Sequence, residues 1–354
     1  MRNKHYAMKP YAKPSHGTAA TWLLCCPIRH LHPGRLLVIL TLTSLVICGS
    51  PMLAQTSDTA SIENFRETLS LRPMLIYTYN SLSFSESRFT DPEVDYIANA
   101  PLAMGLRLGW HSYGISYSFN IPGTQFVPNA PSKMFDFQYH HNGRWLLGDL
   151  YLLAYRGYYT RDSARRVTFH PNVSFLRIGA RASYPIQGDN LSYSAIFDQG
   201  ESQRVTAFCF PVGLGFYYQR LFLPKGREII QLNERYTLEI FVGMTGVAPF
   251  RKHYFAAAEA SIGFSHPVNF NHAVAFSPTL TTAARISIGY TVRLWSLALV
   301  IYSHTMDFAP APKQYISLRS GTVELAYTLR LFAMPKALRW LEYGQGQCLP
   351  TSVE

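Results

Sequence analysis

Charged side chains that could bind or pass a solute recur at alternating positions of otherwise apolar segments. The candidates for an inward, lumen-facing surface are Arg107, Arg156, Arg177, Arg181, Arg285, Arg330, Asp136, Asp149, Glu239, Glu259 and Glu324. Guanidinium groups make paired hydrogen bonds to carboxylates and phosphates, so such a surface could bind or pass an anionic solute. The alternative is a mixed-charge network that fills the interior and keeps it closed. We favour the network, because a barrel of about a dozen strands has a narrow interior once long side chains enter it.

Catalytic chemistry is not predicted. Asp198, Glu201, Gln203 and Arg204 are interpreted as the charged tip of a hairpin, which needs only contact with water. A membrane-embedded hydrolase would need a serine and a histidine on neighbouring strands. The residues available for that role are Ser192, Ser194, His253 and His266, and no motif links them. We therefore assign no catalytic residue, and an enzyme acting on lipid or lipopolysaccharide is kept only as an alternative.

A metal or cofactor site is not predicted either. His140 and His141 are adjacent at an expected turn, where their side chains diverge, and no further ligands accompany them. The sequence contains no phosphate-binding loop, no serine-hydrolase elbow and no zinc-protease motif. The chain is therefore expected to have no metal and no cofactor.

The elements that would position the charged residues are amphipathic strands. In residues 102–110, one face carries Leu102, Met104, Leu106, Leu108 and Trp110, and the other carries Arg107 among small residues. Successive side chains of a strand point to opposite faces, so this pattern indicates one apolar and one polar side. Strands are predicted at 71–84, 102–110, 113–121, 134–140, 145–159, 173–184, 206–218, 236–244, 254–264, 281–290, 295–302 and 322–332. A short run at 191–197 is a possible further strand, so ten to fourteen strands are compatible with the sequence.

Composition agrees with an all-β membrane protein. Hydrophobic residues make up 48% of the 354 residues, yet the mean hydropathy is −0.01. That combination excludes a multi-helix membrane protein and fits an antiparallel transmembrane β-barrel, in which apolar and polar residues alternate. Aromatic residues that we expect to face outward at the bilayer interfaces are Trp110, Tyr117, Tyr218, Trp295, Tyr302 and Tyr327. A soluble exported β-barrel that binds a small apolar ligand is the alternative of a third class.

The first 54 residues are interpreted as a secretory signal with an unusually long positive region. An apolar run at 36–48 follows Arg29 and Arg35, and small residues precede an expected cleavage after Ala54. Lipidation at Cys48 is an alternative that the large Ile47 disfavours. The predicted organisation is a signal peptide at 1–54, a periplasmic lead-in at 55–70, a barrel at 71–332 and a tail at 333–354.

Partners are inferred from the same features. The formal net charge is +11, but six Lys or Arg residues and no acid lie in the first 55 residues, and no dense basic stripe predicts nucleic-acid binding. Outer-membrane lipid is the expected surrounding. The strand from Tyr327 to Phe332 ends in an aromatic residue and resembles the signal that barrel-assembly machinery reads, although a tail follows it here. The sequence predicts no oligomeric state.

Two stretches carry a family resemblance. One runs from Phe135 to Tyr159, and the other contains Ser192, Tyr193, Phe197, Gln199, Glu201 and Gln203. With the 102–119 hairpin, these resemble an uncharacterised Bacteroidetes family, domain of unknown function 4421, over most of 71–332. The resemblance implies an outer-membrane barrel of a Gram-negative, Bacteroidetes bacterium, with a porin-like shape. It implies no activity, so a structural, binding or limited solute-passage role is expected.

Overall fold

The structure is a computed structural model that describes residues 61–65, 68–85, 94–162, 164–223, 234–268, 278–311 and 314–331. The predicted signal peptide, its cleavage site, Phe332 and the 333–354 tail lie outside these ranges. The strands are β1 (Ile62–Asn64), β2 (Leu69–Ser85), β3 (Val94–Ala98), β4 (Leu102–Trp110), β5 (Tyr113–Asn120), β6 (Lys133–Asn142), β7 (Leu147–Arg161), β8 (Val167–Ile186), β9 (Glu201–Gln203), β10 (Ala207–Phe222), β11 (Arg235–Phe250), β12 (Tyr254–Val268), β13 (Thr279–Thr291), β14 (Trp295–Ala311) and β15 (Gln314–Leu331). A short π-helix, η1 (Ser194–Asp198), lies between β8 and β9.

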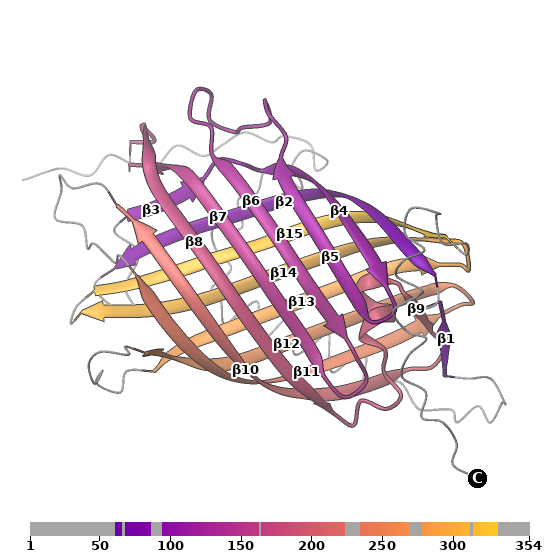
Figure 1. The fold of residues 1–354 in the computed structure, drawn as a ribbon. Helices are drawn as coiled ribbons and strands as arrows, with labels where there is room; N and C mark the ends of the chain where they lie inside the picture. Colours follow the sequence, from indigo (N-terminus) through magenta and orange to yellow (C-terminus); the bar gives the residue numbers. More distant parts are fainter. Residues whose placement is uncertain are drawn as a thin grey trace, which may run out of the picture. The chain divides into compact units, whose positions relative to one another are not determined.

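Twelve of these strands close into an antiparallel barrel (Figure 1). Each strand pairs with the next ring member along the chain, and β15 pairs with β2 to close the ring. The closing register places Thr322 opposite Thr78 and Leu329 opposite Leu71. Closure satisfies the edge strands that an open sheet would expose. The predicted fold class and the count of about twelve strands are confirmed.

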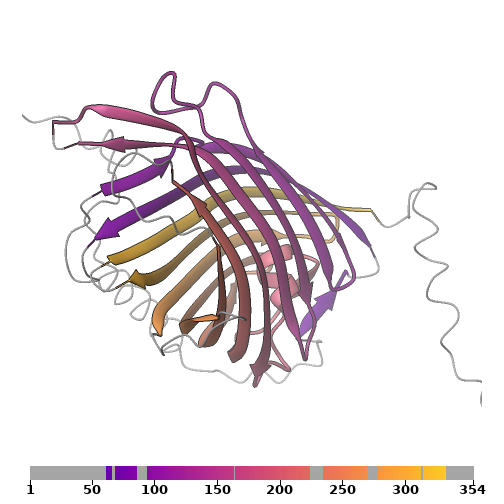
Figure 2. The ribbon, with the colours of Figure 1, turned by 60° about the vertical axis from the view of Figure 1, so that its left-hand side comes forward.

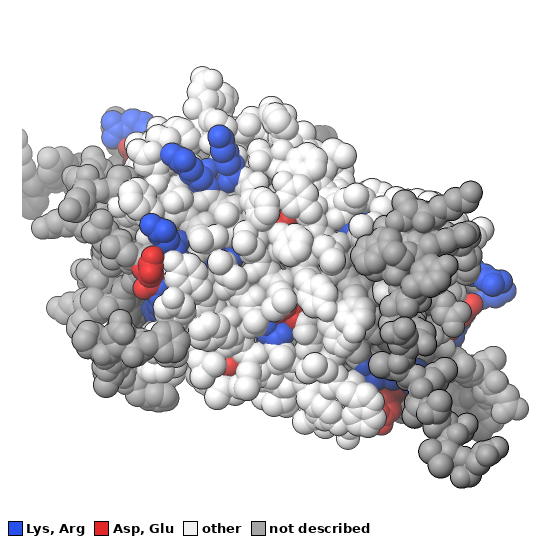
Figure 3. All heavy atoms as spheres, in the orientation of Figure 1, with Lys and Arg blue, Asp and Glu red and all other residues white. Residues whose placement is uncertain are grey.

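The wall of the barrel is apolar on its outer side because the side chains alternate along every ring strand. On β10 the inward positions from Ala207 to Leu221 are buried, while Phe208, Leu214 and Phe222 on the other face are exposed. Figure 3 shows that charged atoms are sparse over the middle of the face drawn there. Within the described residues, no helix has the length and apolar character needed to cross a bilayer.

The two rims of the barrel differ. The near rim is the one where β2 begins and β15 ends, and tight turns such as residues 111–112 and 292–294 lie there. The far rim carries longer connections, including residues 121–132. At the far rim, β3 pairs with both β2 and β7, so it bypasses the β5–β6 hairpin. The stretch between the strands predicted at 71–84 and 102–110 therefore contains a further strand, and β8 begins at Val167, before the predicted start at 173.

Residues 191–204, here called the inward segment, correct two predictions. Figure 2 shows η1 inside the near end of the barrel, beside β1. Residues 191–197 form no strand, because the chain turns into η1. Asp198, Glu201 and Gln203 are not at a hairpin tip in water; Glu201 and Gln203 are buried, and β9 pairs with β1 of the lead-in. Asp198 bonds to Arg107 of the wall, whereas Glu201 and Gln203 bond to Ser192 within the segment, which sequence composition alone does not indicate.

The interior is packed at two levels. Towards the far rim, buried apolar residues from opposite sides of the ring form one cluster, among them Leu82, Tyr158, Leu221 and Met306. At the near rim, a second cluster joins Tyr193, Ile196 and Phe197 of the inward segment to Cys209 and Val247 of the wall. The polar residues that lie between these clusters define the candidate site.

Candidate functional site

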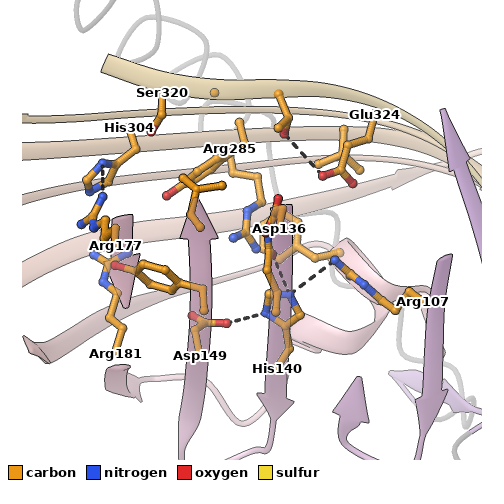
Figure 4. A pocket seen from close by; sticks show the side chains of 18 of the residues that line it. Arg107, Asp136, His140, Asp149, Arg177, Arg181, Arg285, His304, Ser320 and Glu324 are labelled. Atoms are coloured by element: carbon orange, nitrogen blue, oxygen red, sulfur yellow. Dashed lines mark hydrogen bonds and ion pairs between the residues drawn. The ribbon is translucent and has the colours of Figure 1, made fainter. Parts of the chain in front are cut away.

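A polar cavity of about 150 Å³ lies in the middle of the lumen. It is lined by inward side chains of β4, β6, β7, β8, β10, β13, β14 and β15 and by the top of η1 (Figure 4). Its charged lining residues are Arg107, Arg177, Arg181, Arg285, Asp136, Asp149, Asp198 and Glu324. Equal numbers of arginines and carboxylates line this cavity.

One side of the cavity carries two arginines of β8 on aromatic rings. The Arg177 guanidinium lies 4.4 Å from the ring centre of Tyr217 and 3.3 Å, by its NH1, from Nδ1 of His304. The Arg181 guanidinium lies 3.5 Å from the ring centre of Phe241 and donates to the Ser261 hydroxyl at 3.1 Å. Buried Nε atoms of Arg177 and Arg181 have no hydrogen-bond partner. Arginine stacked on an aromatic face keeps its N–H groups directed sideways for a ligand.

Arg285 of β13 has aromatic rings as the contacts of its guanidinium. Its guanidinium lies 4.4 Å from the ring centre of Phe197 and 5.3 Å from that of Tyr302. Glu259 is its cross-strand neighbour on β12. Among the described residues, none forms a hydrogen bond with this guanidinium or an ion pair within 4.0 Å. Arg285 therefore has donors available to a bound anion.

A carboxylate and histidine network lies on β6 and β7, next to β8 in the ring. Nδ1 of His140 lies 2.6 Å from Oδ1 of Asp149, and Nε2 of the same ring lies 3.1 Å from Oε1 of Gln138. Gln138 donates to Asp136 at 3.0 Å. Glu324 accepts from Thr322 at 3.4 Å. Asp149 is the cross-strand neighbour of Arg181, whose Nε lies 3.9 Å from Oε2 of Glu239. Arginines and carboxylates are thus interspersed around the cavity.

Arginines of the wall fix the inward segment at the near end of the cavity. Arg107 forms an ion pair with Asp198, and Asn142 donates to the same carboxylate. Arg72 donates to the Phe197 carbonyl and, at 2.7 Å, to Oε1 of Gln199. Burial alone would raise the pKa of Asp198, but the nearby Arg107 guanidinium holds that pKa below its usual range. Asp198 is therefore an anion that the wall binds.

Arg330 makes the second set of contacts to the inward segment. Its Nε donates to the Gln199 carbonyl at 3.1 Å, and its NH1 donates to the Val292 carbonyl at 2.6 Å. Its guanidinium also lies 4.4 Å from the ring centre of Phe65 in the lead-in. The lead-in, the inward segment and the last strand of the ring thus meet at one arginine.

The six motif residues quoted for the family resemblance are all buried in this segment. Ser192 donates its hydroxyl to Glu201, and its backbone N–H donates to Oε1 of Gln203 at 3.0 Å. The Tyr193 hydroxyl lies 2.6 Å from the Thr245 hydroxyl of the wall, and burial raises the pKa of Tyr193 well above its usual value. The motif therefore specifies a folded insert with its own internal hydrogen bonds.

Most predicted lumen residues are brought together, and one is not. Those that line the cavity are Arg107, Arg177, Arg181, Arg285, Asp136, Asp149 and Glu324. Glu239, Glu259 and Arg330 lie on the inner face outside the cavity lining. The prediction for Arg156 is wrong, because inward positions of β7 run from Leu147 to Tyr155 at every second residue and Arg156 is exposed on the outer face. A bulge between Arg156 and Tyr158 shifts the register at this point and obscures the alternation in the sequence.

Some residues of the site were not singled out from the sequence. Arg72 is an inward residue of β2 that binds the inward segment, and alternation with Met74 and Ile76 could have identified it. His304 also faces the cavity, as does His140, which was expected at a turn but lies within β6. Tyr302, expected on the outer wall, lines the cavity, because it lies seven residues from the outward Trp295 and an odd spacing reverses the face.

The serine and histidine residues considered for catalysis do not meet. Ser192 bonds to Glu201 in the inward segment, whereas His253 lies in a near-rim turn beside the Thr291 carbonyl at 3.2 Å. His266 is near the far end of β12. Within the part of the chain that the structure describes, no group of three His, Cys, Asp or Glu side chains is placed to hold a metal ion.

A protein-family profile decides the relationship of the chain. The family described as Domain of unknown function (DUF4421) matches residues 56–330. This chain belongs to that family. The match covers the lead-in, the inward segment and the ring of this DUF4421 protein, so the predicted family is confirmed.

Solved structures similar to this DUF4421 protein are bacterial outer-membrane proteins. The translocator domain of the autotransporter NalP from Neisseria meningitidis has a TM-score of 0.38 and 12% identity, covering 83% of this chain and 95% of that chain. The β domain of the Bordetella autotransporter BrkA has a TM-score of 0.36 and 8% identity, covering 73% and 98%. The outer-membrane protease OmpT from Escherichia coli has a TM-score of 0.34 and 6% identity, covering 77% and 99%. At these values none of the three assigns an activity, and no curated protein matches the chain significantly.

Proposed function

We propose that this protein is an outer-membrane β-barrel of a Gram-negative bacterium whose lumen is a closed chamber that binds a small solute carrying a carboxylate or phosphate group. The observation that supports this most is Arg285, whose guanidinium lies on the ring of Phe197 and has no bonding partner among the described residues. Arg177 and Arg181 also line the cavity. The carboxylates interspersed with these arginines would receive a cationic or hydroxyl group of the same solute. Passage through the lumen would require the inward segment to move.

The proposed membrane location rests on the outer wall. Exposed Leu214, Ile240 and Phe264 lie side by side in register at mid-wall. Close to the near rim, the Trp295 ring centre lies 5.3 Å from that of Tyr290 and 6.0 Å from that of Tyr327. Such rows of aromatic side chains are typical of the aromatic belts of transmembrane barrels. A soluble ligand-binding barrel would carry a polar outer wall, so these residues argue against that alternative. We also propose, from the sequence, a Bacteroidetes source and cleavage after Ala54. Recognition of the last strand by the assembly machinery is proposed on the same basis.

A non-enzymatic role is proposed because the described neighbours of the His140–Asp149 pair include no hydroxyl or thiol bonded to the imidazole. The second ring nitrogen of His140 faces Gln138 at 3.1 Å and Arg107 at 3.4 Å. Lipid profiling of a deletion strain tests this point. We expect unchanged lipid A and phospholipid composition, and loss of one modified lipid species would favour the enzyme alternative.

Solute binding is tested by calorimetry on the purified barrel in neutral detergent. We expect succinate to bind and glucose not to bind, and Arg285→Gln to weaken succinate binding about tenfold, since a hydrogen bond to a charged group is worth about 1.5–3 kcal/mol. Arg319→Gln is the matched control, because Arg319 is exposed on the outer face of β15. Equal affinity of wild type and Arg285→Gln would contradict the assignment of this arginine. Absence of any anion binding would leave the structural network as the role of the lumen.

A further inference from the structure

Two cations of the outer wall lie directly opposite one another. Lys133 of β6 and Arg156 of β7 are cross-strand partners, and both are exposed. Directly opposed residues have Cβ atoms about 4.5–5.5 Å apart, and like charges in this relation destabilise a sheet. Neither side chain forms a hydrogen bond or ion pair with any described residue. A like-charge pair that the described residues leave uncompensated is a candidate site for an external anion.

On the four described strands around the pair, the outer face lacks carboxylates. Outward positions of β5, β6, β7 and β8 carry no Asp or Glu. The adjacent β7–β8 hairpin adds exposed Arg161 and Arg165, while Asp162 is engaged by Arg166 at 2.7 Å. Figure 3 shows basic atoms gathered over the upper ends of these strands, as Figure 1 labels them. This part of the rim is therefore a local positive patch.

The position of the pair along the strands, at the end of the apolar outer surface, indicates which kind of anion would bind. Below Lys133 on β6, the outward residues are Phe135, Phe137 and Tyr139, and below Arg156 on β7 they include Leu150. At about 3.3 Å per residue and a tilt of about 40°, the stretch from Lys133 to His141 rises by about 20 Å, close to the roughly 25 Å apolar band of such barrels. Lys133 and Arg156 thus lie where the hydrocarbon layer ends and lipid headgroups begin.

We propose that Lys133 and Arg156 bind a phosphate group of an anionic lipid in the leaflet at the far rim, while its acyl chains pack on Phe135 and Phe137. The guanidinium of Arg156 supplies two parallel donors to phosphate oxygens, and the ammonium of Lys133 supplies a point charge. A free phosphate ion would use the same donors but would gain nothing from the apolar wall. The proposal rests on the proposed membrane location, which cell fractionation tests separately from the binding experiment.

The test uses the purified full chain in neutral detergent with diphosphoryl lipid A, the same lipid without phosphates, and inorganic phosphate as probes. We expect diphosphoryl lipid A to raise the thermal unfolding temperature and to remain attached in native mass spectrometry. The double variant Lys133→Gln/Arg156→Gln should bind at least about tenfold more weakly, as expected for lost charged hydrogen bonds. The charge-retaining Lys133→Arg/Arg156→Lys should bind like wild type, and so should the control Arg319→Gln, whose cross-strand neighbours Ser81 and Thr305 are uncharged.

Folding of the double variant is checked without lipid. It should unfold at the wild-type temperature or above, because the substitutions are on the exposed face and relieve repulsion. Equal lipid A binding by wild type and the double variant would overturn the proposal, as would binding of the dephosphorylated lipid with equal affinity. An equal stabilisation by inorganic phosphate would show a free-phosphate site and would also overturn it.

Discussion

Asp198 is the residue through which the wall holds the inward segment. Its carboxylate accepts from Arg107 and Asn142, which lie on different strands of the ring. A buried ion pair adds little against an apolar replacement, but removing one partner leaves an uncompensated charge and is costly. Asp198 therefore matters mainly because Arg107 would otherwise be buried alone.

Replacing Asp198 by Asn should loosen the inward segment. We expect the variant to lose about 3 kcal/mol in the free energy of holding the segment in place, the lower end of the range for breaking a buried pair. Limited proteolysis should cut within residues 187–206 far faster than in wild type, while the barrel itself stays folded by heat-modifiable gel mobility. Asp189→Asn is the control, because Asp189 is exposed in the same connection. Equal cleavage of the two variants would contradict the role of Asp198.

The same carboxylate predicts a pH dependence. Its pKa in the folded protein is lower than the usual value of about 3.9, so its contribution to stability is complete above that value and is lost as the pH falls through the lowered pKa. The wild-type segment should stay protected from neutral pH down to about 4 and open only in stronger acid. An acid-stable protease followed over pH 2–5 measures this opening. A profile in Asp198→Asn that matches wild type would show that another group controls the segment.

Among the elements, the ring strands were predictable and the insert was not. Alternation located strands such as β4 and β10, because an apolar outer wall and a small or polar inner wall impose a period of two. Residues 191–204 have no such period, and their charges suggested contact with water. In the structure Asp198 pairs with Arg107 of the wall, and arginines of two other strands donate to Gln199. The predicted inward orientation of Arg156 was wrong for a local reason, because a bulge next to it reverses the alternation of faces. Long-range pairing of this kind has no signature in one sequence.

The β1–β9 pairing predicts that the lead-in stabilises the inward segment. Arg204 forms a half-exposed ion pair with Glu63, and the Arg204 N–H donates to the Ser61 carbonyl at 2.9 Å. Deleting residues 61–64 should increase proteolysis of the inward segment, whereas Glu63→Gln should have a small effect, because exposed pairs are worth about 0–1 kcal/mol. Trypsin cleavage rates of the two variants measure the difference. Unchanged protection after the deletion would mean that the wall alone holds the segment.

At the scale of the whole molecule, the apolar wall and the contacts across the interior have separate causes. The wall follows from exposed apolar side chains on every ring strand, and sequence alternation predicted it. The contacts across the interior join side chains of distant strands, such as Gln219 of β10 and Met306 of β14 at 3.0 Å. The pairing of β15 with β2 joins the last strand of the ring to the first, and local sequence patterns do not specify this pairing.

The wall predicts a depth-dependent cost of charge. Leu214→Arg places a cation at mid-wall and should destabilise the barrel in lipid vesicles by about 2–4 kcal/mol, whereas Phe222→Arg at the far end of the same strand should cost about 0–1 kcal/mol. Urea-induced unfolding in phosphatidylcholine vesicles measures both. Equal costs at the two positions would argue against a membrane-spanning wall.

The central claim is that residues 191–204 fold inside the near end of the barrel, and Cys209 reports on it directly. Cys209 points inward, is fully buried, and lies 3.5 Å by its sulfur from the Tyr193 hydroxyl of the segment. In the mature chain carrying Cys348→Ser, a membrane-impermeant maleimide should leave Cys209 unlabelled in the folded wild type. It should label Cys209 readily when residues 191–203 are replaced by a glycine–serine linker. Rapid labelling of the folded wild type, at the rate of the linker variant, would contradict the claim.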